Sequence, residues 1–123
     1  MKLYIIAGAN GSGKTTFAKS FAQIHKMHFI NADEIAKELD PDNIIKHQVK
    51  AGRIFFQELN KRLDEHNSFV IETTLSGKYL VKYIKKAQVN GFEVEMIYLF
   101  LEKPETNITR VLIRVIAGGH HVP

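Results

Sequence analysis

Residues Gly8–Thr15 (GANGSGKT) match the pattern G-x-x-x-x-G-K-[ST] at every fixed position, and they directly follow the apolar run Leu3–Ala7. Glycines in such a loop let backbone N–H groups point at phosphate oxygens, and the positive end of the following helix adds to the attraction. The lysine reaches the β- and γ-phosphates, and the hydroxyl after it ligates Mg²⁺. The sequence therefore predicts a nucleoside triphosphate site, and the residues expected to bind the nucleotide are Gly8, Ala9, Asn10, Gly11, Ser12, Gly13, Lys14, Thr15 and Thr16.

The nucleotide is expected to be ATP with Mg²⁺. No N-K-x-D motif, which recognises guanine, occurs in the chain, so ATP is favoured over GTP. In this interpretation Lys14 contacts the transferring phosphoryl group, and Thr15 is the metal-binding residue.

Two acidic residues lie where expected strands end. Asp33 follows the strand expected at His28–Asn31, and Glu72 lies near the end of the strand expected at Ser68–Thr73. Carboxyl ends of parallel strands face the ligand crevice, so Asp33 could accept a proton from an attacking hydroxyl or support Mg²⁺. Glu72 could hold Mg²⁺ through water or bind substrate. Thr74 could add a donor. The alternatives are that Asp33 is a helix N-cap and that Glu72 is a solvated strand end.

A pair of arginines lies near the C-terminal end of the chain. Arg110 and Arg114 are four residues apart, so they share a face of the helix expected at Glu105–Ile116. Arginines on a helix before the Gly118-Gly119 loop are typical of a lid that neutralises charge on a transferring phosphoryl group. The alternative is a solvated basic face.

Strand and helix patterns alternate along the rest of the chain. This alternation predicts an α/β protein with a parallel sheet of at least four strands flanked by helices in three layers. The remaining expected strands are Lys2–Ala7 and Phe92–Leu101, and the remaining expected helices are Lys14–His25, Asp33–Leu39, Asn43–Glu65 and Lys78–Val89.

Composition indicates one ordinary globular domain over residues 1–123, with 45% hydrophobic and 24% charged residues. The absence of cysteine excludes disulfides and zinc–thiolate sites. No apolar run approaches the roughly 20 residues of a membrane span, and no signal segment precedes the first strand, so we expect a cytoplasmic protein without a membrane partner. The net charge of +4 suits an anionic ligand but is too dispersed to indicate nucleic acid.

Four segments in this order resemble the zeta-toxin-like small P-loop kinases. They are Gly8–Thr16, Asn31–Glu34 (NADE), Phe69–Gly77 (FVIETTLSG) and Arg110–Pro123 (RVLIRVIAGGHHVP). The resemblance spans nearly the whole chain. It implies a P-loop kinase fold, the use of ATP and Mg²⁺, phosphorylation of a hydroxyl of UDP-N-acetylsugars, and restraint by an antitoxin-like protein partner.

The resemblance also implies roles for individual residues. Asp33 matches the general base, Glu72 and Thr74 match substrate contacts, and Arg114 matches the lid arginine. Ser76 stands where the toxins have a sugar-nucleotide-binding arginine. Relatives also continue past the residues equivalent to 118–123 into an arginine-rich helix, so the chain is expected to lack C-terminal helices of the domain.

Two classes of function follow from the sequence. One is an ATP-dependent kinase that phosphorylates a hydroxyl of a small acceptor, either a UDP-N-acetylsugar or another metabolite. The other is a nucleotide-binding module without kinase activity. The turnover of bound ATP into a phosphorylated acceptor separates the two classes.

Overall fold

The computed structural model describes residues 1–8, 13–39, 42, 48–73, 78–102 and 109–117. Strands and helices alternate over most of this part of the chain, as the sequence predicts. In chain order they are β1 (Lys2–Ala7), α1 (Lys14–Ile24), β2 (His28–Ile30), α2 (Ala32–Leu39), α3 (Gln48–Glu65), β3 (Phe69–Thr73), α4 (Lys78–Val89), β4 (Glu93–Glu102) and β5 (Thr109–Ala117).

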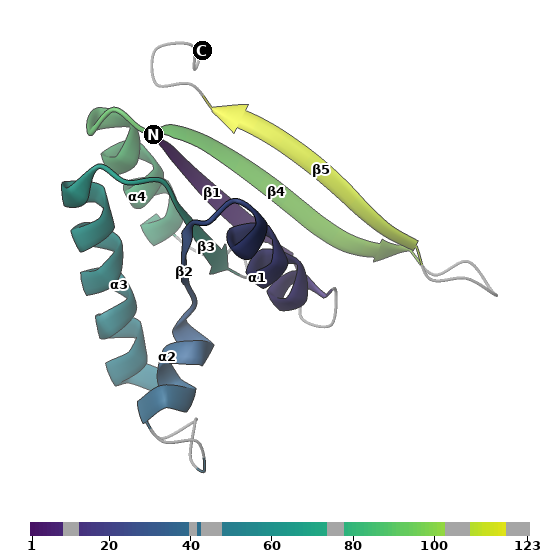
Figure 1. Ribbon diagram of the computed structural model, residues 1–123, viewed down its shortest axis with the longest axis horizontal. Helices are drawn as coiled ribbons and strands as arrows, with labels where there is room; N and C mark the ends of the chain where they lie inside the picture. Colours follow the sequence, from purple (N-terminus) through teal and green to yellow (C-terminus); the bar gives the residue numbers. More distant parts are fainter. Residues whose placement is uncertain (9–12, 40–41, 43–47, 74–77, 103–108, 118–123) are drawn as a thin grey trace.

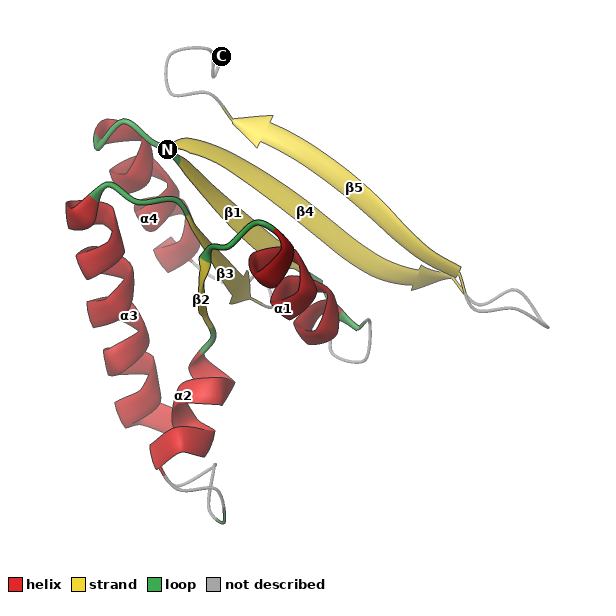
Figure 2. Ribbon diagram, viewed as in Figure 1, coloured by secondary structure: helices red, strands yellow, loops and turns green. Residues whose placement is uncertain are grey.

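The strands form one sheet in the order β2-β3-β1-β4-β5 (Figures 1 and 2). The first four strands in this order run parallel, and β5 pairs with β4 in the antiparallel direction. The expected class, an α/β protein with at least four parallel strands flanked by helices, is therefore confirmed. Parallel neighbours need crossover connections, which α1, α3 and α4 supply.

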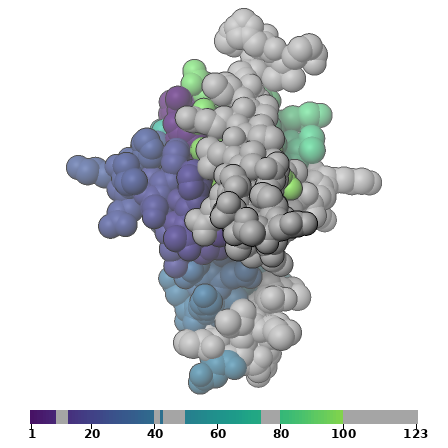
Figure 3. Space-filling model, turned by 90° about the vertical axis from the view of Figure 1, so that its right-hand side faces the viewer, coloured from purple at the N-terminus to yellow at the C-terminus, as the bar shows by residue number. Residues whose placement is uncertain are grey.

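Helices cover both faces of the parallel strands. In Figure 1, α1 lies in front of the sheet, while α3 and α4 lie behind it. Figure 3 views the molecule from the β5 side, with the described atoms of α1 on one flank and those of α2 below them. The two covered faces explain why β1 is apolar at successive positions instead of alternating with polar residues.

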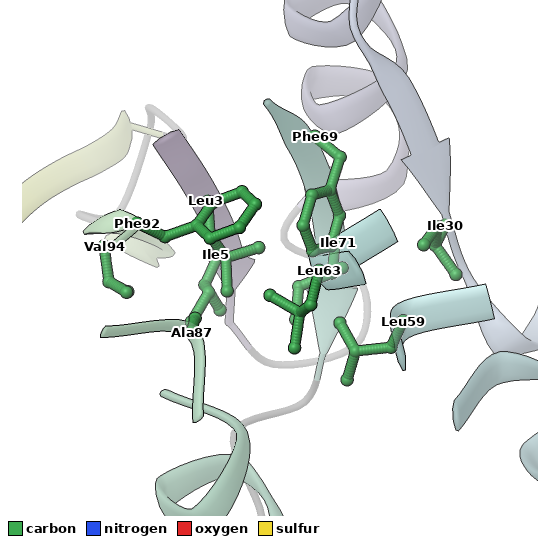
Figure 4. Packing of buried hydrophobic residues seen from close by; sticks show 10 residues of the cluster. All are labelled: Leu3, Ile5, Ile30, Leu59, Leu63, Phe69, Ile71, Ala87, Phe92 and Val94. Atoms are coloured by element: carbon green, nitrogen blue, oxygen red, sulfur yellow. The ribbon is translucent and has the colours of Figure 1, made fainter. Parts of the chain in front are cut away.

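The core is divided by the sheet into two clusters. Leu3 and Ile5 of β1 point toward α3 and α4, where they join the ten-residue cluster drawn in Figure 4. Tyr4 and Ile6 point toward α1 and join the second cluster. Since side chains alternate along a strand, one six-residue strand supplies both halves of the core.

The prediction of a helix at Glu105–Ile116 is wrong. Residues Thr109–Ala117 form the strand β5, which pairs with β4 over nine residue positions, and residues 105–108 lie outside the described part. Five of these nine residues are β-branched, which favours an extended backbone, and the ten-residue β4 offers an edge for them to pair with. The β-branched residues are Thr109, Val111, Ile113, Val115 and Ile116.

The expected boundaries of the other strands and helices agree with the structure to within two residues, apart from one helix. The expected helix Asn43–Glu65 corresponds to α3, which begins at Gln48, and residues 43–47 lie outside the described part. In the described residues, no helix combines the length and apolar character needed to cross a membrane.

We predict that Phe69→Ala lowers the free energy of unfolding by about 3–5 kcal/mol, as measured by urea denaturation. Phe69 is fully buried, and its ring meets that of Phe92 edge to face at 5.8 Å. Val89→Ala, at a position 87% exposed, serves as the control and changes the same quantity by less than about 0.5 kcal/mol. A loss below about 1 kcal/mol for Phe69→Ala would contradict this packing.

Candidate active site

The two central strands end side by side. In the β1–β3 ladder Ile6 pairs with Glu72 and Ala7 pairs with Thr73. The phosphate loop leaves β1 immediately after Ala7. The pairing therefore brings the start of this loop next to Glu72, at the point where the strand order reverses and where such sheets bind ligands.

The last residues of the phosphate-loop motif lie at the start of α1. Gly13 has a φ of 84°, in the left-handed region, where a residue with a Cβ would be strained. Its carbonyl oxygen accepts a hydrogen bond from the N–H of Phe17 at 3.0 Å. Lys14, the first residue of the helix, is 8% exposed. The glycine thus lets the chain turn so that Lys14 enters a buried position at the helix N-terminus.

The hydroxyl of Thr15 donates a hydrogen bond to Oε1 of Glu72. Glu72 is 7% exposed, so its interpretation as a merely solvated strand end is wrong. A hydroxyl and a carboxylate are oxygen ligands of the kind that Mg²⁺ prefers, so this pair fits the metal expected from the motif. In such a site Thr15 would bind the metal directly and Glu72 would bind it through water.

The N-terminus of α2 is capped by Asn31 and not by Asp33. Oδ1 of Asn31 accepts a hydrogen bond from the N–H of Glu34 at 3.0 Å, and its carbonyl oxygen accepts one from Ile35 at 3.2 Å. Glu34 in turn pairs with Lys19 of α1 at 2.6 Å. With Asn31 capping the helix, the exposed carboxylate of Asp33 is not needed as the cap.

A pocket of about 280 Å³ at this edge of the sheet is lined by three of the residues predicted to act in catalysis or binding. Lys14 comes from α1, Asp33 from the first turn of α2 and Glu72 from the end of β3. One cation and two carboxylates thus border one space, although they are up to 58 residues apart in the chain, from position 14 to position 72. This arrangement suits a phosphate-bearing ligand next to a group that gives up a proton.

Helix α3 contributes a wall of this pocket that the sequence analysis did not identify. Gly52, Phe55 and Phe56 line the same pocket as Asp33. Positions 52, 55 and 56 follow the i, i+3, i+4 spacing of one helix face, so this segment presents a glycine and two aromatics together. The sequence spacing shows that these three residues share one face of the helix. Only the packing of α3 beside α2 shows that this face borders the pocket.

Other predicted residues lie on other elements or outside the described part of the chain. Arg110 and Arg114 lie on β5, opposite Leu101 and Ile97, so they are separated from β1 by β4. Thr16 is exposed on α1. Ala9, Asn10, Gly11, Ser12 and Thr74 lie outside the described residues.

We predict that Asn31→Ala lowers the free energy of unfolding by about 1 kcal/mol, because the N–H of Glu34 loses its cap. Asn31→Ser restores most of that loss, because a serine hydroxyl also accepts this hydrogen bond. Asp33→Asn changes the free energy of unfolding by less than about 0.5 kcal/mol. Thermal and urea denaturation measure all three variants, and a larger loss at position 33 than at position 31 would reverse the assignment of the cap.

Known proteins resemble this chain both in sequence and in structure. A family model described as an AAA domain matches residues 3–117. An uncharacterized protein of Haemophilus influenzae is 35% identical over 121 residues, which cover 98% of this chain and 86% of that protein.

Two solved structures share the fold. A candidate kinase of Chloroflexus aurantiacus superimposes with a TM-score of 0.65 at 15% identity, over 79% of this chain and 58% of that one. An unliganded sugar kinase of Janibacter sp. superimposes with a TM-score of 0.50 at 21% identity, over 80% of this chain and 59% of that one. This chain thus spans less than two thirds of either solved chain.

The family match covers most of the chain, and it agrees with the phosphate-loop motif and with the parallel sheet that carries it. The chain belongs to the AAA domain family and has a P-loop kinase-like fold.

Proposed function

We propose that this chain is an ATP-dependent kinase that transfers the γ-phosphoryl group of ATP to a hydroxyl of a small acceptor. The observation that carries the proposal is the single pocket lined by Lys14, Asp33 and Glu72. A nucleotide-binding module needs the lysine at the phosphates, but it has no use for an additional carboxylate across the pocket. In-line phosphoryl transfer uses both a phosphate-binding cation and a residue that orients or deprotonates the acceptor.

The proposed phosphoryl transfer forms one bond to phosphorus and breaks another. The acceptor oxygen forms a bond to the γ-phosphorus while the bond from that phosphorus to the β–γ bridging oxygen breaks. Asp33 accepts the proton of the acceptor hydroxyl, and ADP leaves. Lys14 offsets the negative charge on the phosphoryl oxygens, and its burial strengthens this interaction because water screens it less.

Magnesium completes the proposed site. Thr15 and Glu72 would hold it, and when bound it would neutralise part of the charge on the phosphates. Glu72 also borders the acceptor pocket, where it would contact a substrate hydroxyl. The contribution of Arg110, Arg114 and Thr74 to phosphate or substrate binding stays a prediction from the sequence.

The acceptor implied by the resemblance is a UDP-N-acetylsugar, and other small metabolites with a hydroxyl are the alternative. The AAA domain family match is coarser than the zeta toxin family, so the sugar nucleotide and an antitoxin-like partner stay part of this proposal. Ser76, in place of an arginine, favours testing a broad set of acceptors.

We predict that Lys14→Ala weakens ATP binding by about 10- to 100-fold, because a charged hydrogen-bonding group is lost from the phosphates. Isothermal titration with Mg-ATP measures this change. Lys61→Ala, at an exposed position on α3, removes the same charge away from the pocket and leaves the affinity unchanged. Equal affinity for the wild type and Lys14→Ala would contradict the nucleotide site.

We predict that Asp33→Asn retains ATP binding but lowers phosphoryl transfer by about 10²–10⁴-fold. The assay incubates the protein with Mg-ATP and polar metabolites that include UDP-N-acetylglucosamine, and mass spectrometry detects phosphorylated products. Asp64→Asn on the exposed end of α3 is the matched control. Wild-type transfer by Asp33→Asn would exclude this base, and no transfer by the wild type despite ATP binding would favour the binding module.

We predict that Thr15→Val removes most of the gain in ATP affinity that Mg²⁺ provides, because the hydroxyl expected to ligate the metal is replaced by a methyl group. Titrations of ATP with Mg²⁺ and with EDTA give this gain directly. Thr15→Ser keeps a hydroxyl and retains the gain. A Thr15→Val protein with the full magnesium effect would remove Thr15 from the metal site.

A further inference from the structure

A small apolar recess adjoins the pocket that contains Asp33. The recess has a volume of about 80 Å³ and shares the side chains of Phe55, Phe56 and Thr73 with the larger pocket. Its other walls are formed by one residue of α3, one of β3 and two of α4. They are, in that order, Leu59, Ile71, Leu80 and Tyr83.

The walls of the recess are held in position by the core. Leu59 and Ile71 are 1% and 2% exposed, and both belong to the main hydrophobic cluster. The rings of Phe56 and Tyr83 stack nearly parallel, with centroids 5.1 Å apart and planes 14° apart. This spacing leaves no room for a third ring between them, so a ligand would lie against their edges and the aliphatic walls. The recess is therefore a preformed apolar hollow.

Gly52 keeps the approach to this hollow open. It lies inside α3, although glycine is a poor helix former. A Cβ at position 52 would meet no heavy atom within 4 Å among the described residues, so no close packing partner there accounts for the glycine. Since Gly52 lines the same pocket as Asp33, the empty space above it belongs to that pocket.

The combined cavity has two chemically different ends. Lys14, Asp33 and Glu72 border one end, while the other is lined mainly by aromatic and aliphatic side chains. A ligand made only of hydroxyl and phosphate groups would leave the apolar walls in contact with water. A ligand with an apolar group would displace that water, and burial of apolar surface is favourable.

We propose that the acceptor is an alcohol that also carries a compact apolar group, and that this group lies in the recess while the hydroxyl lies near Asp33. This inference rests on the proposed kinase function. It narrows the acceptor class by the shape and polarity of the cavity, with Gly52 and Leu80 as residues that determine specificity.

Benzyl alcohol is a suitable probe, and glycerol is the polar comparison. Saturation-transfer NMR with the full chain should detect benzyl alcohol with a dissociation constant in the millimolar range, on the order of the affinity expected for so few atoms. Leu80→Phe, which fills the recess, should weaken binding at least about fivefold. Val81→Phe places the same phenylalanine side chain one residue away, at a position 53% exposed, and should leave binding unchanged.

Gly52→Ala keeps the test valid if Leu80→Phe disturbs the fold. Alanine favours the helix, so the melting temperature should rise by about 2–6 °C, while the added methyl group narrows the pocket and weakens probe binding. A stabilised protein with weaker binding is not explained by damage to the structure. Unchanged affinity for benzyl alcohol in both Gly52→Ala and Leu80→Phe would overturn the proposal.

Measuring both probe binding and phosphoryl transfer on the same proteins distinguishes a failure of this inference from a failure of the kinase proposal. Transfer to polar acceptors with no binding of benzyl alcohol would remove the recess from the site but leave the kinase function intact. Binding of benzyl alcohol that Leu80→Phe weakens, with no phosphoryl transfer to any alcohol, would retain the apolar subsite and overturn the kinase. Equal binding of glycerol and benzyl alcohol would overturn the apolar preference.

Discussion

The pairing of β1 with β3 is the contact on which the rest of the molecule depends. These strands have almost no exposed surface from Leu3 to Ala7 and from Phe69 to Ile71, so their register is held by packing on both faces. A slip of one residue would turn every side chain of a strand to the opposite face. The register that buries the apolar residues also sets Glu72 beside the start of the phosphate loop.

The site places charged groups where burial alone would be unfavourable. Lys14 and Glu72 are 8% and 7% exposed, and removing a charge from water costs free energy unless partners compensate. The hydroxyl of Thr15 compensates Glu72 in part. In the proposed function, phosphates and a metal would add further interactions to these two buried charges.

Helix α3 serves the core and the pocket at the same time. Leu59 and Leu63 are buried against the sheet, while Gly52, Phe55 and Phe56 border the pocket one to three turns earlier. Because a helix is rigid over this length, the packing of its C-terminal half fixes the position of the pocket wall. Core packing and the shape of this pocket are therefore coupled through one element.

The sequence by itself determined the parallel α/β class, the phosphate loop and the strand ends near Asp33 and Glu72, because these follow from local patterns: apolar runs, helix periodicity and glycine spacing. It did not predict that Thr109–Ala117 is a strand, because runs of β-branched and apolar residues fit either state until an open edge such as that of β4 is available. Nor did it predict that Asn31 caps α2 or that Gly52 and Phe55 face the pocket. These depend on which helix packs beside which strand end, and only the tertiary structure decides that.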